Sequence, residues 1–106
     1  MFARSVSMHL KAGSVAEFTQ TINDEVIPLL RKHKGFLDEI VLAAPSESEA
    51  VGISLWDRKE SAETYNRDTY PEVQKVLAKV VEGTPAVRTY EVTNSTFHRI
   101  AVRAAA

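Results

Sequence analysis

Three residues at alternate positions, Gly52, Ser54 and Trp56, form the pattern in this chain best suited to binding a small molecule. Alternate residues of a β-strand point to the same side, so two small side chains stand beside one large indole. The gap suits a flat molecule, and the indole offers a stacking face and an N–H donor. The alternative is that Trp56 simply fills the seam between a sheet and its helices. The sequence leaves both interpretations open.

Two tyrosines, Tyr65 and Tyr70, lie between expected helical segments, over the mouth of any such pocket. Arg88 and Tyr90 are two apart in an expected strand and share one face. A Tyr–Arg pair can hold a phenolate or a carboxylate, although an exposed stacked pair explains the spacing equally well. The patterns together predict these substrate-binding residues: Val6, Met8, Gly52, Ser54, Trp56, Tyr65, Tyr70 and Arg88.

Metal and nucleophile chemistry finds little support in the sequence. His9, His33 and His98 lack the HxH or HxxxH spacing of metal ligands, so no metal site is expected. The absence of cysteine excludes disulfides and thiol catalysis, and fits a reducing compartment. There is no phosphate loop, nucleophile elbow or Ser-His-Asp signal. These patterns therefore predict no metal site and name no catalytic residue.

These residues must be positioned by one small α+β domain spanning residues 1–106. Alternation from Phe2 to Lys11 predicts a first strand in which Val6, Met8 and Leu10 share a face and Arg4 lies near the exposed end. Ser14 and Glu17 form a capping-box pattern that opens a helix ending at Gly35. A kink or break is expected in this helix at Pro28. Strands over 36–44 and 50–56 follow, and then a short helix capped by Asp57 with Glu60 and ending near Asn66. The rest of the chain is expected to form a helix from Pro71 to Gly83, a strand over 86–92, a candidate fifth strand over 97–102 and a frayed end over about 103–106.

The order β-α-β-β-α-β is the ferredoxin-like split βαβ plan with an antiparallel sheet. Right-handed crossovers place both helical segments on one face and leave the other bare. Val41, Ile53 and Leu55 are expected on that bare face, which is too apolar to remain in water. A two-fold homodimer would cover it, with the candidate fifth strand extending to the partner.

Four segments resemble the antibiotic biosynthesis monooxygenase family over nearly the whole chain: S-V-S-M-H-L-K-A-G, K-G-F-L, I-S-L-W-D-R-K-E-S-A and P-A-V-R-T-Y-E-V. The resemblance implies a dimeric α/β barrel. It also implies an oxygenase that uses no metal or flavin of its own, in which a substrate held between sheet and helices itself activates oxygen. The polyketide-oxidising branch has an Asn four positions before the Trp and a Tyr six after it. This chain keeps Trp56 but has Gly52 and Ala62 there.

The haem-degrading branch of the same family uses a strand-one Asn, a helical Trp and a helical His. The matching positions here are Val6, Tyr65 and Lys75. Lysine replaces the axial iron ligand, so no haem degradation is expected.

Charge and hydropathy exclude several classes of partner. Lys and Arg total 13 against 14 Asp and Glu, so no field of one sign gathers nucleic acid or anionic lipid. No stretch approaches a membrane span of about 20 apolar residues, and the first residues lack a signal-peptide core. The expected location is the cytoplasm.

Two functions remain open. The first is a cofactor-independent monooxygenase acting on a small aromatic or quinol-like substrate, and the second is a non-catalytic small-ligand-binding or stress-related dimer. An open, mostly apolar cavity holding Tyr65, Tyr70 or Arg88 would favour the enzyme. A filled space beneath Trp56 would favour the second function.

Overall fold

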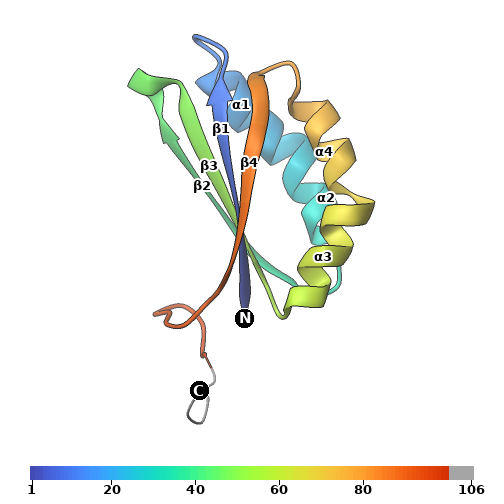
Figure 1. The fold of residues 1–106 in the computed structure, drawn as a ribbon. Coiled ribbons are helices and arrows are strands. Elements are labelled where there is room, and N and C mark those ends of the chain that lie inside the picture. The colour runs from blue at the N-terminus through green and yellow to red at the C-terminus, as the bar shows by residue number, and fades with distance from the viewer. Residues whose placement is uncertain (101–106) are drawn as a thin grey trace.

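The computed structural model describes residues 1–100 and shows an α+β ferredoxin-like fold. A four-stranded antiparallel sheet in the order β2-β3-β1-β4 carries its helices on one face, and the other face is bare (Figure 1). The elements are β1 (Phe2–Leu10), α1 (Val15–Thr21), the π-helical turn η1 (Ile22–Val26), α2 (Ile27–Arg31), β2 (Phe36–Ala44), the 3-10 turn η2 (Pro45–Glu47), β3 (Glu49–Trp56), α3 (Lys59–Asp68), α4 (Tyr70–Leu77) and β4 (Val81–Glu91). Within residues 1–100 no helix is long and apolar enough to cross a membrane.

The first helical segment runs without a break from α1 through η1 to α2. Its buried stripe recurs every four residues, at Phe18, Ile22, Val26 and Leu30. The irregularity expected at Pro28 takes the form of the π turn that precedes it, in which the Ile27 N–H bonds to the carbonyl of Ile22, five residues back. This wider turn accommodates a residue that cannot donate.

Neither predicted capping box forms. Ser14 precedes α1, but its φ of −100° and ψ of 4° are not the extended backbone of a capping serine, and its side chain makes no cap hydrogen bond. α3 begins at Lys59, which leaves Asp57 one residue too early to cap it. The Asp57 carboxylate instead accepts a hydrogen bond from the Ser61 hydroxyl at 2.6 Å.

The fourth strand starts earlier than expected, and Gly83 does not end a helix. α4 stops at Leu77, and β4 begins at Val81. Pairing draws this segment into the sheet, since the Lys11 N–H donates to the carbonyl of Val80 at 2.9 Å and Leu10 pairs with Val81. Gly83 therefore lies in the strand with a φ of 70°, a conformation suited to glycine.

Strand register decides which residues face the helices. Gly52 pairs with Val6 on one side and with Val41 on the other, so all three share the helix-covered face. The expectation that Val41 lies on the bare face is therefore wrong. An irregularity between Phe36 and Asp38 adds one residue to β2, which turns every later side chain of that strand to the opposite face.

The bare face carries the apolar character that the sequence indicated. Ile53 and Leu55 lie there as expected, half-buried, and Ile40, Leu42 and Tyr90 are 43%, 53% and 47% exposed.

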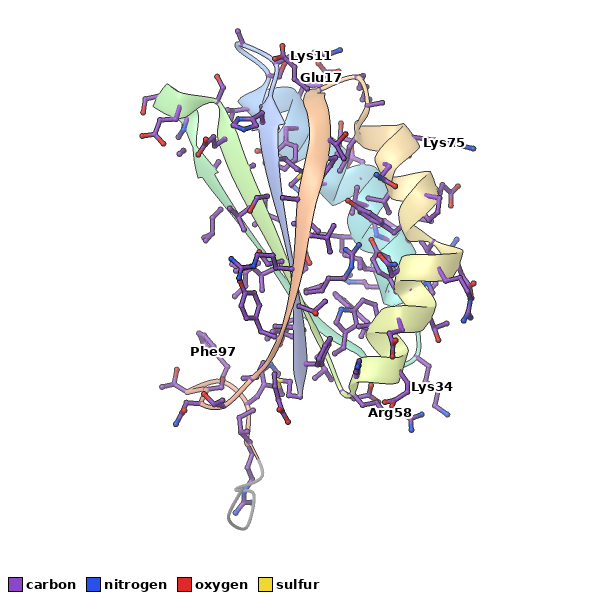
Figure 2. All side chains as sticks on the ribbon, viewed as in Figure 1. Lys11, Glu17, Lys34, Arg58, Lys75 and Phe97 are labelled. Carbon is purple, nitrogen blue, oxygen red and sulfur yellow. The ribbon has the colours of Figure 1, made fainter. Side chains whose placement is uncertain are left out.

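The segment after β4 is not a strand in its described part, up to residue 100, and residues 101–106 of the expected strand and frayed end lie outside the described residues. The imidazole of His98 in this segment hydrogen-bonds the carboxylate of Asp38. Phe97 is 86% exposed and projects away from the body of the domain (Figure 2).

Candidate functional site

Trp56 is enclosed by its own neighbours. Its side chain is fully buried, and its Nε1 donates to the Ser54 hydroxyl at 2.9 Å. Three rings surround the indole with centroids at 5.2 Å for Tyr65, 5.5 Å for Phe36 and 6.1 Å for His33. The stacking face and the N–H donor that made Trp56 a candidate are therefore both occupied within the protein.

A partly open space does exist between sheet and helices, but it lies toward Gly52 and not beneath Trp56. This inner chamber has a volume of about 40 Å³. Its walls include six of the residues predicted from sequence: Val6, Met8, Gly52, Ser54, Tyr65 and Tyr70. Arg88 does not join them, because it pairs with Ser5 on the bare face, where its guanidinium lies 5.6 Å from the centre of the Tyr90 ring.

A second, outer chamber adjoins the first at the edge formed by β1, β4 and α4. Its volume is about 160 Å³. Val6, Met8, Tyr70 and Leu77 line both chambers, so the two are neighbours that share these four wall residues. The remaining residues of the outer wall are Gln74, Ala78, Val81, Gly83 and Pro85. An apolar cavity of about 150 Å³ accommodates a benzene ring, so the outer chamber has room for one ring.

Arg4 contributes a buried cation to the inner chamber, which sequence reasoning missed. It was expected near an exposed end, yet it is only 3% exposed. Its Nη2 donates to the Asn66 side-chain oxygen at 2.7 Å, and its Cζ lies 4.0 Å from the centre of the Tyr70 ring and 5.3 Å from that of Tyr65. Two tyrosines from α3 and α4 thus cover the cation and stabilise it through their ring faces.

Glu39 contributes a carboxylate from the other side of the same chamber. Its Oε2 lies 3.2 Å from the position that a Cβ on residue 52 would occupy, so the side chain passes over the glycine. No hydrogen bond or ion pair of this carboxylate occurs among residues 1–100. Burial raises the pKa of Glu39 from 4.5 to about 7, and the nearby Arg4 charge opposes that rise.

Arg4 and Glu39 lie on the two strands that flank Ser54. Arg4 and Glu39 both pair with Ser54 in the sheet, one from β1 and one from β2. They approach closely enough to influence one another's ionisation, yet within the described part of the chain they form no ion pair at 4.0 Å or less.

Tyr70 supplies a buried hydroxyl without a hydrogen-bond partner among residues 1–100. A buried polar group left unpaired costs about 1–3 kcal/mol, so such a group marks a place where a ligand or water completes the site. Burial raises the pKa of Tyr65 well above its ordinary range, which keeps that phenol neutral. The walls of the inner chamber therefore combine a cation, an ionisable carboxyl group and the hydroxyl-bearing side chains of Ser54, Tyr65 and Tyr70 with mostly apolar residues.

Comparisons with known proteins agree at the level of fold. No protein-family model matches the chain, and neither does any curated protein sequence. SnoaB, a cofactor-independent oxygenase from Streptomyces nogalater, superposes with a TM-score of 0.73 at 11% identity, covering 90% of this chain and 95% of that one. The monooxygenase ActVA-Orf6 of Streptomyces coelicolor, solved with nanaomycin D, gives a TM-score of 0.74 at 14% identity, covering 89% and 88%.

A candidate antibiotic biosynthesis monooxygenase from Deinococcus radiodurans gives a TM-score of 0.71 at 16% identity, covering 90% of this chain and 95% of that one. The chain has the fold of antibiotic biosynthesis monooxygenases. At these identities the likeness is one of fold, and the chemistry must be argued from the site itself.

The polar groups of the inner chamber lie at positions other than those of the functional residues in the two family branches described above. Gly52 lies in the wall of the inner chamber without a polar side chain, and Ala62 is buried at 2% exposure. Lys75 is exposed and projects from α4 away from the sheet (Figure 2). Arg4, Glu39 and Tyr70 supply the polar groups of the chamber instead. Residues 1–100 contain no group of three His, Cys, Asp or Glu that could hold a metal ion.

Proposed function

We propose that this protein is a cofactor-independent monooxygenase that oxidises a small aromatic or quinol-like substrate between the sheet and the helices. The observation that carries this proposal is the buried Tyr70 hydroxyl without a partner among residues 1–100, on a residue that lines the inner chamber together with Arg4 and Glu39. Apolar walls bind a ring by burial, and a few convergent polar groups orient it. The fold shared with a cofactor-independent oxygenase supports the proposal.

The reaction balances with molecular oxygen as the only oxidant. One oxygen atom enters the substrate, the other leaves as water with two substrate hydrogens, and the substrate supplies four electrons. An aromatic ring reduces oxygen more readily once its hydroxyl group is ionised. A guanidinium and a hydroxyl donor stabilise such an oxyanion strongly where water is excluded, and Arg4 and Tyr70 in the wall of the inner chamber carry these two groups.

Oxygen uptake tests this function. The purified protein, treated with a chelator and supplied with no flavin, is mixed with a panel of quinols and polyphenols in an oxygen electrode. We expect uptake above the rate of spontaneous oxidation for single-ring members of the panel. Tyr70→Phe should reduce that rate, whereas the matched control Tyr90→Phe, on the bare face, should leave it unchanged. Uptake at the spontaneous rate with every compound would refute the proposal.

A non-catalytic small-ligand-binding dimer is the second candidate. The closed packing around Trp56 and the small inner chamber favour it. In that case the same panel would bind to the protein, as measured by calorimetry, while oxygen uptake stayed at the spontaneous rate.

A homodimer through the bare sheet face is proposed for either function. Ile40 and Leu42 are large, apolar and 43% and 53% exposed, beside the half-buried Ile53 and Leu55. Two such faces packed together remove this apolar surface from water. Light scattering at micromolar concentration should give twice the single-chain mass. A single-chain mass would exclude the dimer.

A further inference from the structure

We propose that the substrate is a single-ring phenol and that Glu39 accepts its proton while Arg4 and the Tyr70 hydroxyl hold the resulting phenolate oxygen. This inference rests on the proposed function and deepens it, because it names the substrate class and the proton acceptor. It draws on three features of the site: the sizes of the two chambers, the charges that face the inner one, and a second opening beside Glu39.

The sizes of the two chambers suit one ring with a small polar substituent. The outer chamber, at about 160 Å³, has the volume of an apolar cavity that holds benzene. The inner chamber, at about 40 Å³, has room for a hydroxyl or a similarly small substituent but not for a second ring. A phenol therefore fits with its ring against Val6, Met8 and Leu77 and its hydroxyl directed inward.

The charges of the inner chamber favour an internal proton transfer. Arg4 is a permanent cation at 3% exposure, so the chamber is neutral only when it holds one negative charge. In the free protein that charge resides on Glu39 once the pH exceeds its raised pKa of about 7. When a phenol transfers its proton, the substrate O–H bond breaks, an O–H bond forms on Glu39, and the electron pair remains on the substrate oxygen. The net charge of the chamber does not change, which avoids the cost of adding a buried charge.

Glu39 has a route by which the accepted proton can leave. It lines not only the inner chamber but also a hollow of about 300 Å³ between β2 and the helical segment from α1 to α2, whose other walls are Phe18, Thr19, Ile22, Asn23, Ile27, Val41 and Ala43. The carboxyl group is only partly buried, in agreement with its place between the two spaces. The proton can therefore pass to solvent on the side away from the substrate.

The surroundings of Glu39 contain few competing titratable groups. Arg4 faces it from β1, Tyr65 from α3 and Tyr70 from α4. The residues that η1 and α2 present to the chamber are the apolar Ile22, Val26 and Leu30. The raised pKa of Glu39, about 7, supports the role of proton acceptor, because a general base is most effective when its pKa lies near the working pH.

Proton uptake on binding para-nitrophenol tests the proposal without turnover. This phenol resists oxidation, and its neutral and ionised forms absorb at different wavelengths. Calorimetry is run in buffers of different ionisation enthalpy, at a pH where both the ligand and Glu39 are ionised in their free states. Wild type should take up close to one proton per bound ligand, and the bound ligand should have the phenolate spectrum. Glu39→Gln should take up almost none, whereas the control Glu49→Gln, on the exposed end of β3, should behave as wild type.

Other outcomes would overturn the assignment. Wild-type binding without proton uptake, or with the neutral phenol spectrum, contradicts it even if Glu39→Gln does not fold. A nitronaphthol that binds as tightly as para-nitrophenol contradicts the single-ring limit, since we expect it to bind at least about tenfold more weakly. Oxygen uptake without proton uptake would refute the role of Glu39 and spare the proposed oxygenase. Proton uptake without oxygen uptake would refute the proposed oxygenase and spare the role of Glu39.

Discussion

The space between the sheet and the helices differs at its two ends in side-chain packing and in hydrogen bonding. At the Trp56 end, one large ring is packed among other rings and its N–H is bonded to Ser54. At the Gly52 end, the missing side chain leaves room for the Glu39 carboxylate, and the Tyr70 hydroxyl has no partner among residues 1–100. Packing is complete at the first end and incomplete at the second.

This difference separates the side chains that stabilise the fold from those that we propose bind the ligand. His33 also meets a partner at the Trp56 end, since its Nε2 lies 2.6 Å from the Thr69 hydroxyl. Satisfied polar groups and packed rings stabilise the folded state. A desolvated carboxyl group and an unpaired hydroxyl lower that stability, and such costs concentrate at functional sites. We therefore propose that the Trp56 end contributes stability and that the Gly52 end binds the ligand.

The largest change in the free energy of unfolding is expected for substitutions of Trp56, at the packed end. Trp56→Ala should lower the free energy of unfolding by about 3–5 kcal/mol, because it removes a fully buried ring and leaves a cavity. Trp56→Phe keeps most of the ring and should cost less. Urea denaturation measures both. A loss below about 1 kcal/mol for the alanine variant would show that this end is not the packed one.

Filling the open end should affect binding more than folding. Gly52→Leu should abolish ligand binding at a cost of roughly 1–3 kcal/mol in stability, because the new side chain meets Glu39 and Met8. Gly52→Ala is the graded control, since its Cβ would lie 3.2 Å from the Glu39 Oε2 and 4.0 Å from the Met8 Cε. Calorimetry with para-nitrophenol measures the affinities. Unchanged affinity in Gly52→Leu would place the site elsewhere.

The pH dependence of stability should carry the signature of Glu39. Its pKa rises from 4.5 in the unfolded chain to about 7 in the folded one, so the folded state binds more protons between these values. Stability must therefore fall as pH rises from about 4.5 to about 7, by on the order of 2 kcal/mol after allowance for partial exposure. Comparing urea unfolding of wild type and Glu39→Gln across this range isolates the contribution. Parallel pH profiles for the two proteins would contradict it.

The smallest effect on stability is expected at Tyr70. Tyr70→Phe removes a buried hydroxyl that has no partner within residues 1–100, so the free energy of unfolding should stay within about 1 kcal/mol of wild type or rise. Phenol binding should weaken up to about tenfold through the lost hydrogen bond. Thermal unfolding and calorimetry provide the two values. A large loss of stability would mean that the hydroxyl is satisfied in the folded protein.

Much of the fold could be predicted because local patterns and tertiary structure agree over most of the chain. Strand alternation and helical spacing placed β1, β2 and β3 within a residue or two. The errors arose where tertiary pairing overrode a local pattern. The pair Val80 and Val81 continues a helical stripe, yet hydrogen bonding to β1 begins a strand there.

The candidate site was predicted only in part, for two physical reasons. Trp56 attracted attention as the largest side chain, but its neighbours in space, Phe36 and Tyr65, cannot be recognised from sequence spacing. Glu39, next to Asp38 in the sequence, was expected to be an ordinary solvated charge, which is wrong. A single extra residue in β2 turns it toward Gly52, and a bulge leaves no clear sequence signal. Arg4 was assigned to an exposed end, since its cover of Tyr65 and Tyr70 comes from distant helices.

The position of a bound phenol tests the central claim most directly. A crystal structure of the protein with para-nitrophenol should show the ring in the outer chamber, against Val6, Met8 and Leu77, and the phenolate oxygen between Arg4, Glu39 and the Tyr70 hydroxyl. A ring stacked on Trp56, or held between two protomers at the bare sheet face, would contradict the assignment of binding to the Gly52 end.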